Sequence, residues 1–337
     1  MILKEKPWLW RIPFLVLLVV GSVWAIKKNR TQAEKGVWQS AEGTVFGTVY
    51  HATYQSDKDL HSELLAALDS VDASLSMFNP QSTVSLINSN KSDSADSLFT
   101  HVFTLAQKVS GKTGGAFDVT VAPLVNAWGF GFKNGTLPDS LQVDSILQYV
   151  GWQRVALQEG RVVKDDPNIV MDFSAIAKGF GCDRVAEVFR RHGVQNFMIE
   201  IGGEVVVQGK NKKGEPWRVG VNKPVDDASS SSTELEEVLS LTDCAMATSG
   251  NYRNFYTTDD GRRVAHTIDP HTGYPVQHSL LSATVFAPTC AEADAFATSF
   301  MVLGLEGAKE VLKQQRQLKV FLIYADGKEN KVYRTIE

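Results

Sequence analysis

The sequence predicts a protein in which α-helices and β-strands are mixed. Its 337 residues are 43% hydrophobic and 21% charged, an ordinary globular composition that excludes a disordered chain, a collagen and a short disulfide scaffold. Apolar residues recur at helical spacing in some stretches, as at Leu60, Leu64 and Leu68, and alternate with polar residues in others. No short-period repeat is visible, so neither a solenoid nor a propeller is expected.

The N-terminal segment differs from the rest of the chain. An uncharged apolar run covers residues 12–26 and has basic residues on both sides. Such a run is typical of an export signal or a membrane anchor, and Val23-Trp24-Ala25 is a candidate cleavage site. A buried N-terminal core helix is the alternative. We expect a signal peptide or membrane anchor over residues 1–30, a polar linker over 31–43 and a single large domain over 44–337.

The charge is unevenly distributed. Residues 1–30 contain six of the 34 Lys and Arg residues but one of the 38 Asp and Glu residues, which leaves 28 basic against 37 acidic residues in the rest. A body with this acidic excess lacks the basic footprint that binding to a phosphate backbone needs. We therefore expect no nucleic-acid partner.

The first half of the chain is expected to contain a strand and two helices. Residues 44–54 alternate in the manner of a strand. Between Asp57 and Leu75, leucine and valine recur every three or four residues, which predicts a helix with one apolar stripe. A second helix is expected from about Phe99 to Ser110, because a group of glycines follows it.

The second half of the chain alternates between helix and strand. A helix over 175–192 is expected to end at Gly193, since glycine favours the left-handed C-cap conformation. Thr289 and Glu292 form a capping-box pattern that begins a helix. The other expected elements are strands over 197–201, 205–208, 217–221 and 281–286, a serine-rich surface loop over 225–234, a helix end at Gly304, a helix near 306–314 and a hairpin turning at Asp326-Gly327.

Several common signatures are missing. The sequence contains no P-loop, no H-E-x-x-H and no G-x-S-x-G motif, which makes ATPase, zinc-protease and serine-hydrolase functions weak hypotheses. Cys182, Cys244 and Cys290 show no C-x-x-C spacing, which argues against a zinc site. We expect three free thiols, with a Cys244–Cys290 disulfide as the alternative.

One residue pair is a candidate magnesium site. Asp294 and Thr298 lie four residues apart on a predicted helix, so their side chains project from the same face. A carboxylate and a hydroxyl are hard oxygen ligands, and Mg²⁺ uses few of them because it keeps waters and substrate phosphates in its shell. A solvated helix face is the alternative.

Three further segments place polar side chains beside turns. Asp118 follows a glycine turn whose backbone can approach a ligand closely, although it can also cap a helix. At a strand-to-helix junction, Lys178 lies one turn after Ser174, and this helix N-terminus with its lysine is a candidate phosphate-binding site. The alternative is that Ser174 caps the helix and Lys178 is solvated. His266 supplies a titratable imidazole beside a turn. A purely structural role is the alternative for this histidine.

Taken in this order, the segments resemble the FAD:protein FMN transferase family, also called the ApbE family. The blocks that carry the resemblance are residues 75–88, 115–131, 171–179, 247–253 and 266–275 with 287–294. They span most of residues 44–334. The resemblance implies a single α/β domain of mixed sheets flanked by helices, and not a doubly wound parallel sheet.

The resemblance also implies a role for each matched residue. The backbone carbonyl of Ala175 and the side chains of Asp294 and Thr298 would hold Mg²⁺, and His266 would take the proton from an attacking hydroxyl. The residues that would line the FAD site are Phe78, Ala116, Phe117, Asp118, Asp172, Lys178 and Ile268. The sequence departs from the family's pattern at Leu75, where Met is frequent, at Ser174 or Ala175, where Gly is common, and at Lys178, where some members carry an acid.

The implied reaction is a transfer to a partner protein. A Ser or Thr hydroxyl would attack the FMN-side phosphorus of FAD, so that AMP is released and FMN stays attached as a phosphoester. The expected acceptors are FMN-carrying subunits of membrane electron-transfer complexes, with the catalytic domain on the periplasmic face of a bacterial inner membrane. The alternatives are a Mg²⁺-dependent FAD pyrophosphatase that gives FMN and AMP, and a non-catalytic exported flavin-binding protein.

Overall fold

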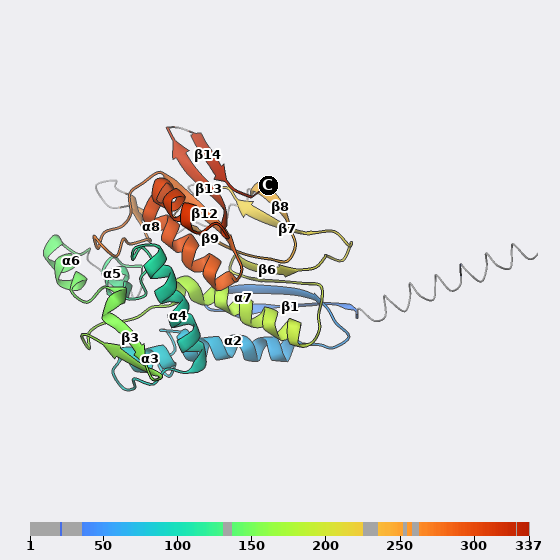
Figure 1. The fold of residues 1–337 in the computed structure, drawn as a ribbon, viewed down its shortest axis with the longest axis horizontal. Coiled ribbons are helices and arrows are strands. Elements are labelled where there is room, and N and C mark those ends of the chain that lie inside the picture. The colour runs from blue at the N-terminus through green and yellow to red at the C-terminus, as the bar shows by residue number, and fades with distance from the viewer. Residues whose placement is uncertain are drawn as a thin grey trace, which may run out of the picture.

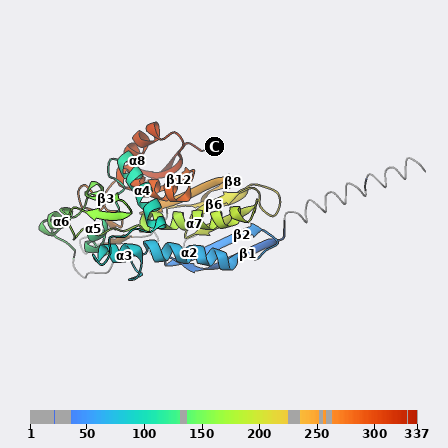
Figure 2. The same cartoon turned by 60° about the horizontal axis from the view of Figure 1, so that its bottom comes forward.

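The computed structural model describes residue 21 and residues 36–130, 137–224, 235–251, 255–257, 263–327 and 329–336. In this part of the chain, helices cover one face of a large sheet (Figure 1, Figure 2). In spatial order the sheet contains β1 (Trp38–Val45), β2 (Thr48–Gln55), β5 (Phe197–Ile201), β6 (Glu204–Gln208), β9 (Cys244–Gly250), β12 (Leu280–Ala287), β13 (Lys319–Asp326) and β14 (Glu329–Arg334). The expected combination of helices and sheets is confirmed, and every strand pair in the described residues is antiparallel.

Two-stranded ribbons and helices complete the described structure. The ribbons pair β3 (Val155–Gln158) with β4 (Arg161–Lys164), β7 (Trp217–Asn222) with β8 (Leu235–Leu241) and β10 (Phe255–Thr257) with β11 (Arg263–Ala265). The helices are α2 (His61–Leu75), α3 (Thr83–Asn88), α4 (Ser97–Lys112), α5 (Ala122–Ala127), α6 (Ser140–Leu147), α7 (Ser174–Arg191) and α8 (Cys290–Gln314). In both ribbon views, α3, α5 and α6 lie with β3 at one end of the molecule.

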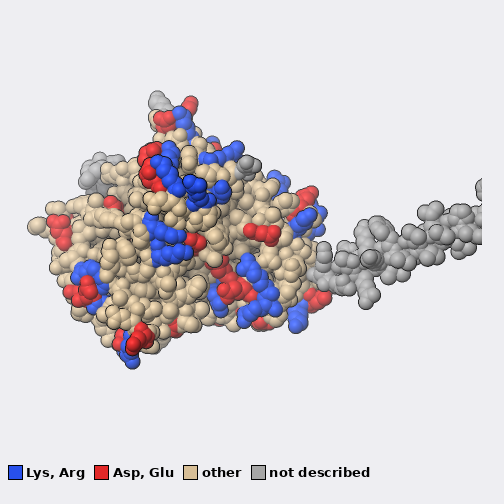
Figure 3. All heavy atoms as spheres, viewed as in Figure 1, with Lys and Arg blue, Asp and Glu red and all other residues tan. Residues whose placement is uncertain are grey.

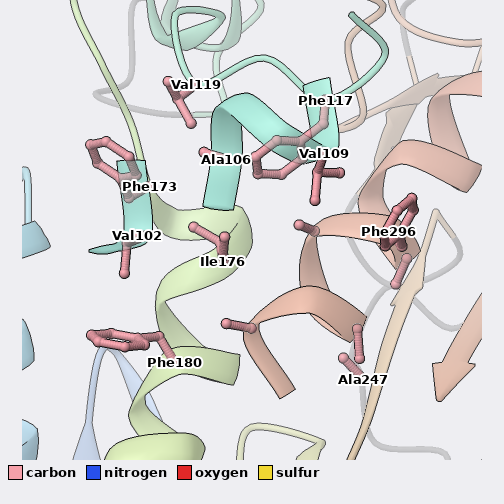
Figure 4. Close-up of a cluster of buried hydrophobic side chains, with 14 of the residues drawn as sticks. Val102, Ala106, Val109, Phe117, Val119, Phe173, Ile176, Phe180, Ala247 and Phe296 are labelled. Carbon is pink, nitrogen blue, oxygen red and sulfur yellow. The ribbon is translucent and has the colours of Figure 1, made fainter. Parts of the chain in front are cut away.

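The largest apolar cluster lies where α4, α7 and α8 meet the sheet. Figure 4 shows Ile176 and Phe180 of α7 in one apolar cluster with side chains of α4 and α8. Phe173, which precedes α7, packs edge-on against Phe99 of α4, with ring centroids 5.2 Å apart. Because interiors are close-packed, this packing fixes the position of the first turn of α7.

The other face of the sheet is covered by the β7–β8 ribbon. Trp217 and Leu239 pack against Val205 of β6, Met246 of β9 and Phe286 of β12. The middle of the sheet is therefore buried on both faces. Burial on both faces accounts for the continuous apolar run in β6, which does not alternate as the strand of a one-sided sheet would.

Charged surface side chains lie next to partners of opposite sign. Figure 3 shows basic and acidic side chains intermingled over one face of the molecule. On α8, Lys309 and Lys313 form ion pairs with Glu306 and Glu310, at 2.7 and 2.6 Å. Exposed pairs of this kind contribute only about 0–1 kcal/mol each, so they balance charge more than they stabilise the fold.

The N-terminal strand prediction is wrong. The single strand expected over 44–54 is two strands, β1 and β2, joined by a turn at Phe46 and Gly47. Both turn residues have positive φ, +51° and +73°. β1 also begins at Trp38, within the range expected to be a linker. Alternation of residues continues through a tight hairpin, so the pattern did not reveal the reversal of direction.

Most of the other elements that the pattern predicted occur at the expected positions. The helices expected over 57–75, 99–110 and 175–192 are α2, α4 and α7, and the C-terminal hairpin turns at Gly327. The two helices expected around Gly304 are the two halves of α8, which breaks there because Gly304 is non-helical, with φ of 70°. Cys182, Cys244 and Cys290 are free, so the alternative disulfide does not form.

Some predictions fall outside the described residues. They include the apolar run over 12–26, apart from Gly21, and the serine-rich loop over 225–234. Among the helices that the structure describes, none has both the length and the apolar character needed to cross a membrane.

Candidate active site

A cavity of about 1410 Å³ lies between the first turn of α7, α8 and the turns at one end of the large sheet. Sites for drug-sized ligands measure roughly 300–1,000 Å³, so this cavity has room for a dinucleotide. All residues that the sequence singled out for a site line it, namely Phe78, Ala116, Phe117, Asp118, Asp172, Ala175, Lys178, His266, Ile268, Asp294 and Thr298. Segments far apart in the sequence therefore meet at one place, and the individual roles of these residues remain predictions.

α8 brings Asp294 and Thr298 to the cavity. The helix starts after Thr289, whose side chain accepts a hydrogen bond from the Glu292 N–H, which is one of the two hydrogen bonds of the predicted capping box. Asp294 is only 2% exposed, and Thr298 Oγ1 lies 3.3 Å from Ser249 Oγ of β9. The pair does not form a solvated helix face. It places one carboxylate and one hydroxyl on the cavity wall.

The second turn of α7 is bound to Asp294. The Gly179 N–H donates to Asp294 Oδ2 at 3.1 Å. A Cβ at Gly179 would lie 2.4 Å from the Cys290 carbonyl oxygen, so only glycine permits this approach of α7 to α8.

These contacts decide whether a magnesium ion suits the site. Asp294, Thr298 and Ala175 line one cavity, and the carboxylate, the hydroxyl and the backbone carbonyl that they carry are hard oxygen donors of the kind that Mg²⁺ prefers. In the described part of the chain, no three His, Cys, Asp or Glu side chains are grouped so that they could hold a metal ion by themselves. A metal here therefore depends on a single carboxylate together with a hydroxyl and a carbonyl.

Lys178 lies beside two carboxylates. Its Nζ is 2.7 Å from Glu204 Oε1 and 3.9 Å from Asp294 Oδ2. Burial lowers the pKa of Lys178, but the charges of Asp294 and Glu204 outweigh this effect and raise its pKa above the ordinary value. Lys178 is therefore a charged, ion-paired residue of the cavity wall and not a freely solvated one.

Both carboxylates resist ionisation. Burial raises the pKa of Glu204 to about 7, the charge of Lys178 opposes that rise and the charge of Asp294 adds to it. Burial also raises the pKa of Asp294, against the opposing effects of Lys178 and the Gly179 N–H. A cation entering this part of the cavity would favour the ionised form of both groups.

Asp118 organises the loop between α4 and α5. Its Oδ1 accepts hydrogen bonds from the N–H and the hydroxyl of Thr120, at 2.7 and 2.6 Å, and its Oδ2 accepts one from the Trp152 N–H at 2.8 Å. Burial raises the pKa of Asp118, and these hydrogen bonds oppose the rise. Asp118 does not cap a helix, since α5 begins only at Ala122. It holds Ala116 and Phe117 in position on the cavity wall.

The start of α7 corrects one expectation. Ser174 is the first helical residue, and the N-cap position is occupied by Phe173, whose side chain is fully buried. Asp172 Oδ1 instead accepts the Ser174 N–H at 2.7 Å, and the Asp172 N–H donates to the Val119 carbonyl at 2.7 Å. Burial raises the pKa of Asp172.

Two aromatic rings accompany His266 and the cavity entrance. The Phe130 ring meets the His266 ring edge-on, with centroids 6.2 Å apart. Phe78, which follows α2, is 68% exposed although it lines the cavity. An exposed aromatic ring at a cavity wall offers a surface on which a flat ligand ring can stack.

Sequence reasoning assigned no role to Glu204 or Ser249, which also line the cavity. The sequence did contain a signal for Glu204, because an acidic residue directly follows Gly202-Gly203 in an otherwise apolar strand. Ser249 carries no comparable signal, since its proximity to Thr298 arises only from the packing of β9 against α8.

The comparisons with known proteins agree with the geometry of the site. The model of the ApbE family matches residues 46–322. The chain is 39% identical over 303 residues to the FAD:protein FMN transferase of Haemophilus influenzae, a match that covers 84% of this chain and 86% of that protein. It is 34% identical over 300 residues to the FAD:protein FMN transferase of Escherichia coli, with 85% of this chain and 84% of that protein covered.

Solved structures show the same fold. The flavin transferase ApbE from Vibrio cholerae matches with a TM-score of 0.79 and 32% identity, over 88% of this chain and 96% of that chain. The apo form of the Pseudomonas stutzeri flavinyl transferase ApbE matches with a TM-score of 0.78 and 27% identity, over 88% and 94% of the two chains. The family model spans well over half of the sequence, and the chain belongs to the ApbE family.

Proposed function

We propose that this protein transfers FMN from FAD to a Ser or Thr hydroxyl of an acceptor protein and releases AMP. The observation that carries the proposal is the convergence of all the predicted site residues on one cavity with room for a dinucleotide. Relatives that bear the name FAD:protein FMN transferase align with most of the chain and support the same reaction.

The chemistry requires one bond to form and one to break. The acceptor hydroxyl oxygen bonds to the FMN phosphorus of FAD, and the bond from that phosphorus to the AMP oxygen breaks. The hydroxyl proton needs a base, and the imidazole of His266 is the candidate because it lines the cavity. General-base catalysis of this kind contributes roughly 10²–10⁴-fold to the rate.

We propose Mg²⁺ as the metal of the site. Asp294, Thr298 and the carbonyl of Ala175 would hold it, and a bound Mg²⁺ supplies positive charge that neutralises a pyrophosphate and its leaving group. The donors fit because all three residues line one cavity and because the buried Asp294 carboxylate accepts a hydrogen bond from Gly179 of α7.

The remaining predicted residues would bind the flavin dinucleotide. The loop that Asp118 organises presents Ala116 and Phe117 to the cavity, and Ile268 adds an apolar surface from the segment after β11. Phe78 offers an exposed ring for stacking. These side chains position the substrate, and positioning together with electrostatic stabilisation is the main requirement of phosphoryl transfer.

We also propose a place and a partner for the enzyme. The apolar run over 12–26 with its basic flanks supports export or anchoring through residues 1–30, with the catalytic domain on the periplasmic face of a bacterial inner membrane. The acceptors would be FMN-carrying subunits of membrane electron-transfer complexes. Fractionation of cells that express the full-length chain and a chain without residues 1–30 tests this location. Equal recovery of both chains in the cytoplasm would contradict it.

The function is tested with the full-length protein purified in detergent. The protein is incubated with FAD, Mg²⁺ and an acceptor domain, and both AMP release and covalent flavin fluorescence of the acceptor are followed. Matched AMP and labelled acceptor support the transferase, whereas AMP without labelled acceptor supports a pyrophosphatase. Bound FAD without AMP would support a binding protein.

Two variants on the same helix separate the site from general effects. Asp294→Asn keeps the shape of the side chain but removes the charge, so transfer and AMP release should both fall by at least 100-fold, about 2.7 kcal/mol of transition-state stabilisation. Glu292→Gln is the matched control, because Glu292 is also buried on α8 but does not line the cavity. Equal activity in the two variants would refute the assignment of Asp294.

A further inference from the structure

Glu204 is the buried acidic residue of the cavity that the reaction outlined above leaves without a task. It begins β6 directly after Gly202 and Gly203, which form the tight turn from β5 with φ of +61° and +106°. The residue is only 2% exposed and lines the same cavity as Asp294.

The two oxygens of the Glu204 carboxylate are in different situations. Oε1 accepts a hydrogen bond from Lys178 Nζ at 2.7 Å. Oε2 is buried and has no hydrogen-bond partner among the described residues. A buried acceptor left without a partner costs about 1–3 kcal/mol, and more when it is charged, so the unpaired Oε2 of this cavity-lining residue indicates a missing donor.

The charges around Glu204 do not balance. Lys178 lies between the carboxylates of Glu204 and Asp294, at 2.7 and 3.9 Å, and is the ammonium group that contacts both. When ionised, these three side chains carry one positive and two negative charges. A buried group of this kind gains stability from an additional cation, because opposite charges attract strongly where water is excluded.

We propose that Glu204 is a positioning residue of the metal site, which binds water from the hydration shell of the magnesium ion through Oε2 while Oε1 holds Lys178. The inference rests on the proposed metal site. Mg²⁺ retains several waters when proteins bind it, and these waters can donate hydrogen bonds to an unpaired carboxylate oxygen. The ion pair of Oε1 with Lys178 keeps the ammonium group beside Asp294 without displacing the metal ion from that carboxylate.

Residues that orient metal ligands or their waters change metal affinity by about 10–100-fold when they are replaced. We therefore expect Glu204→Gln to weaken the binding of Mg²⁺ by that factor. The half-saturating Mg²⁺ concentration for AMP release should rise by the same factor, and the maximal rate at saturating Mg²⁺ should stay within about 3-fold of the original rate. A purely structural role would lower the maximal rate or the stability and leave Mg²⁺ affinity unchanged.

The test titrates the full-length protein, free of FAD, with Mg²⁺ alone and follows binding by calorimetry. Glu204→Asp is the second variant, which keeps the charge but shortens the side chain by one methylene. Its loss of Mg²⁺ affinity should be smaller than that of Glu204→Gln. Glu200→Gln is the control, because Glu200 lines the same cavity from β5 and is only partly buried. This variant removes the same charge without touching Lys178.

The outcomes separate the inference from the proposed metal site. Loss of Mg²⁺ binding in Asp294→Asn together with the expected weakening in Glu204→Gln supports both. If Asp294→Asn abolishes binding and Glu204→Gln binds Mg²⁺ as the unmodified protein does, the metal site stands and the role of Glu204 is refuted. Equal weakening by Glu200→Gln would also refute it, since a general charge effect would then suffice. Normal Mg²⁺ binding by Asp294→Asn would refute the metal site itself.

Discussion

Replacing Gly179 by alanine tests the helix contact that joins the two sides of the candidate metal site. Gly179 lies in α7, where its N–H donates to Asp294 Oδ2. A Cβ added there would be 2.4 Å from the Cys290 carbonyl oxygen and 2.6 Å from the carbonyl carbon. Both obstacles are backbone atoms in the first turn of α8, so no side-chain rotation can relieve the clash.

The size of the effect follows from these distances. Real Cβ contacts are essentially never shorter than 3.0 Å, so α7 and α8 must separate by at least about 0.6 Å. Overpacking a close-packed core costs about 1–3 kcal/mol, which exceeds the roughly 0.5–1 kcal/mol that alanine gains over glycine in a helix. We expect a net loss of roughly 1–2 kcal/mol, which lowers Tm by about 1–3 °C in a protein of this size. Because small displacements of catalytic groups can cost about 100-fold in rate, activity should fall by 10-fold or more.

The assay compares Gly179→Ala with Gly111→Ala. Gly111 is also helical, on α4, but its added Cβ would meet only Trp152 at 3.7 Å, an ordinary contact. Thermal unfolding and FAD-dependent AMP release are measured for both variants. Gly111→Ala should be as stable as the unmodified protein or more so. If Gly179→Ala matched it in stability and activity, the close contact between α7 and α8 would not be the constraint that we infer.

Three further predictions concern single side chains. Asp118→Ala removes a buried acceptor from Thr120 and Trp152, so the unfolding free energy in urea should fall by about 1–3 kcal/mol, and a loss below about 0.5 kcal/mol would contradict the structural role. Burial raises the pKa of Glu204 from 4.5 to about 7, so its contribution to stability is complete below pH 4.5 and is lost as the pH rises through 7. In the metal-free protein, Glu204→Gln should therefore gain stability relative to the unmodified chain between those pH values, and parallel stability curves would refute this. Phe78→Ala should change the unfolding free energy by less than about 0.5 kcal/mol because the ring is exposed, while KM for FAD rises; an unchanged KM would remove Phe78 from the site.

Local pattern located the long helices and several strands of the sheet, but the short helices α3, α5 and α6 and the strands β3, β4, β8 and β9 were not predicted. Apolar spacing located α2 and α4. The glycine at position 193 predicted the end of α7, and the structure gives it the positive φ of a helix C-terminus. The β1–β2 hairpin was missed, since alternation does not change when the chain reverses at Phe46 and Gly47. The order of strands in the sheet was also not predictable, because strand pairing is a long-range contact without a local signature.

Some features of the candidate site could likewise be predicted from the sequence, and others could not. The order of residue types along the chain was enough to indicate the family and to find a carboxylate–hydroxyl pair on one helix. Only the tertiary structure decided that Asp294 is buried against Gly179, that Lys178 is held between two carboxylates and that Glu204 has an unpaired oxygen. Each of these features depends on the packing of α7 against α8 and the sheet. Burial and charge balance arise from contacts between distant segments, and spacing along one segment does not determine them.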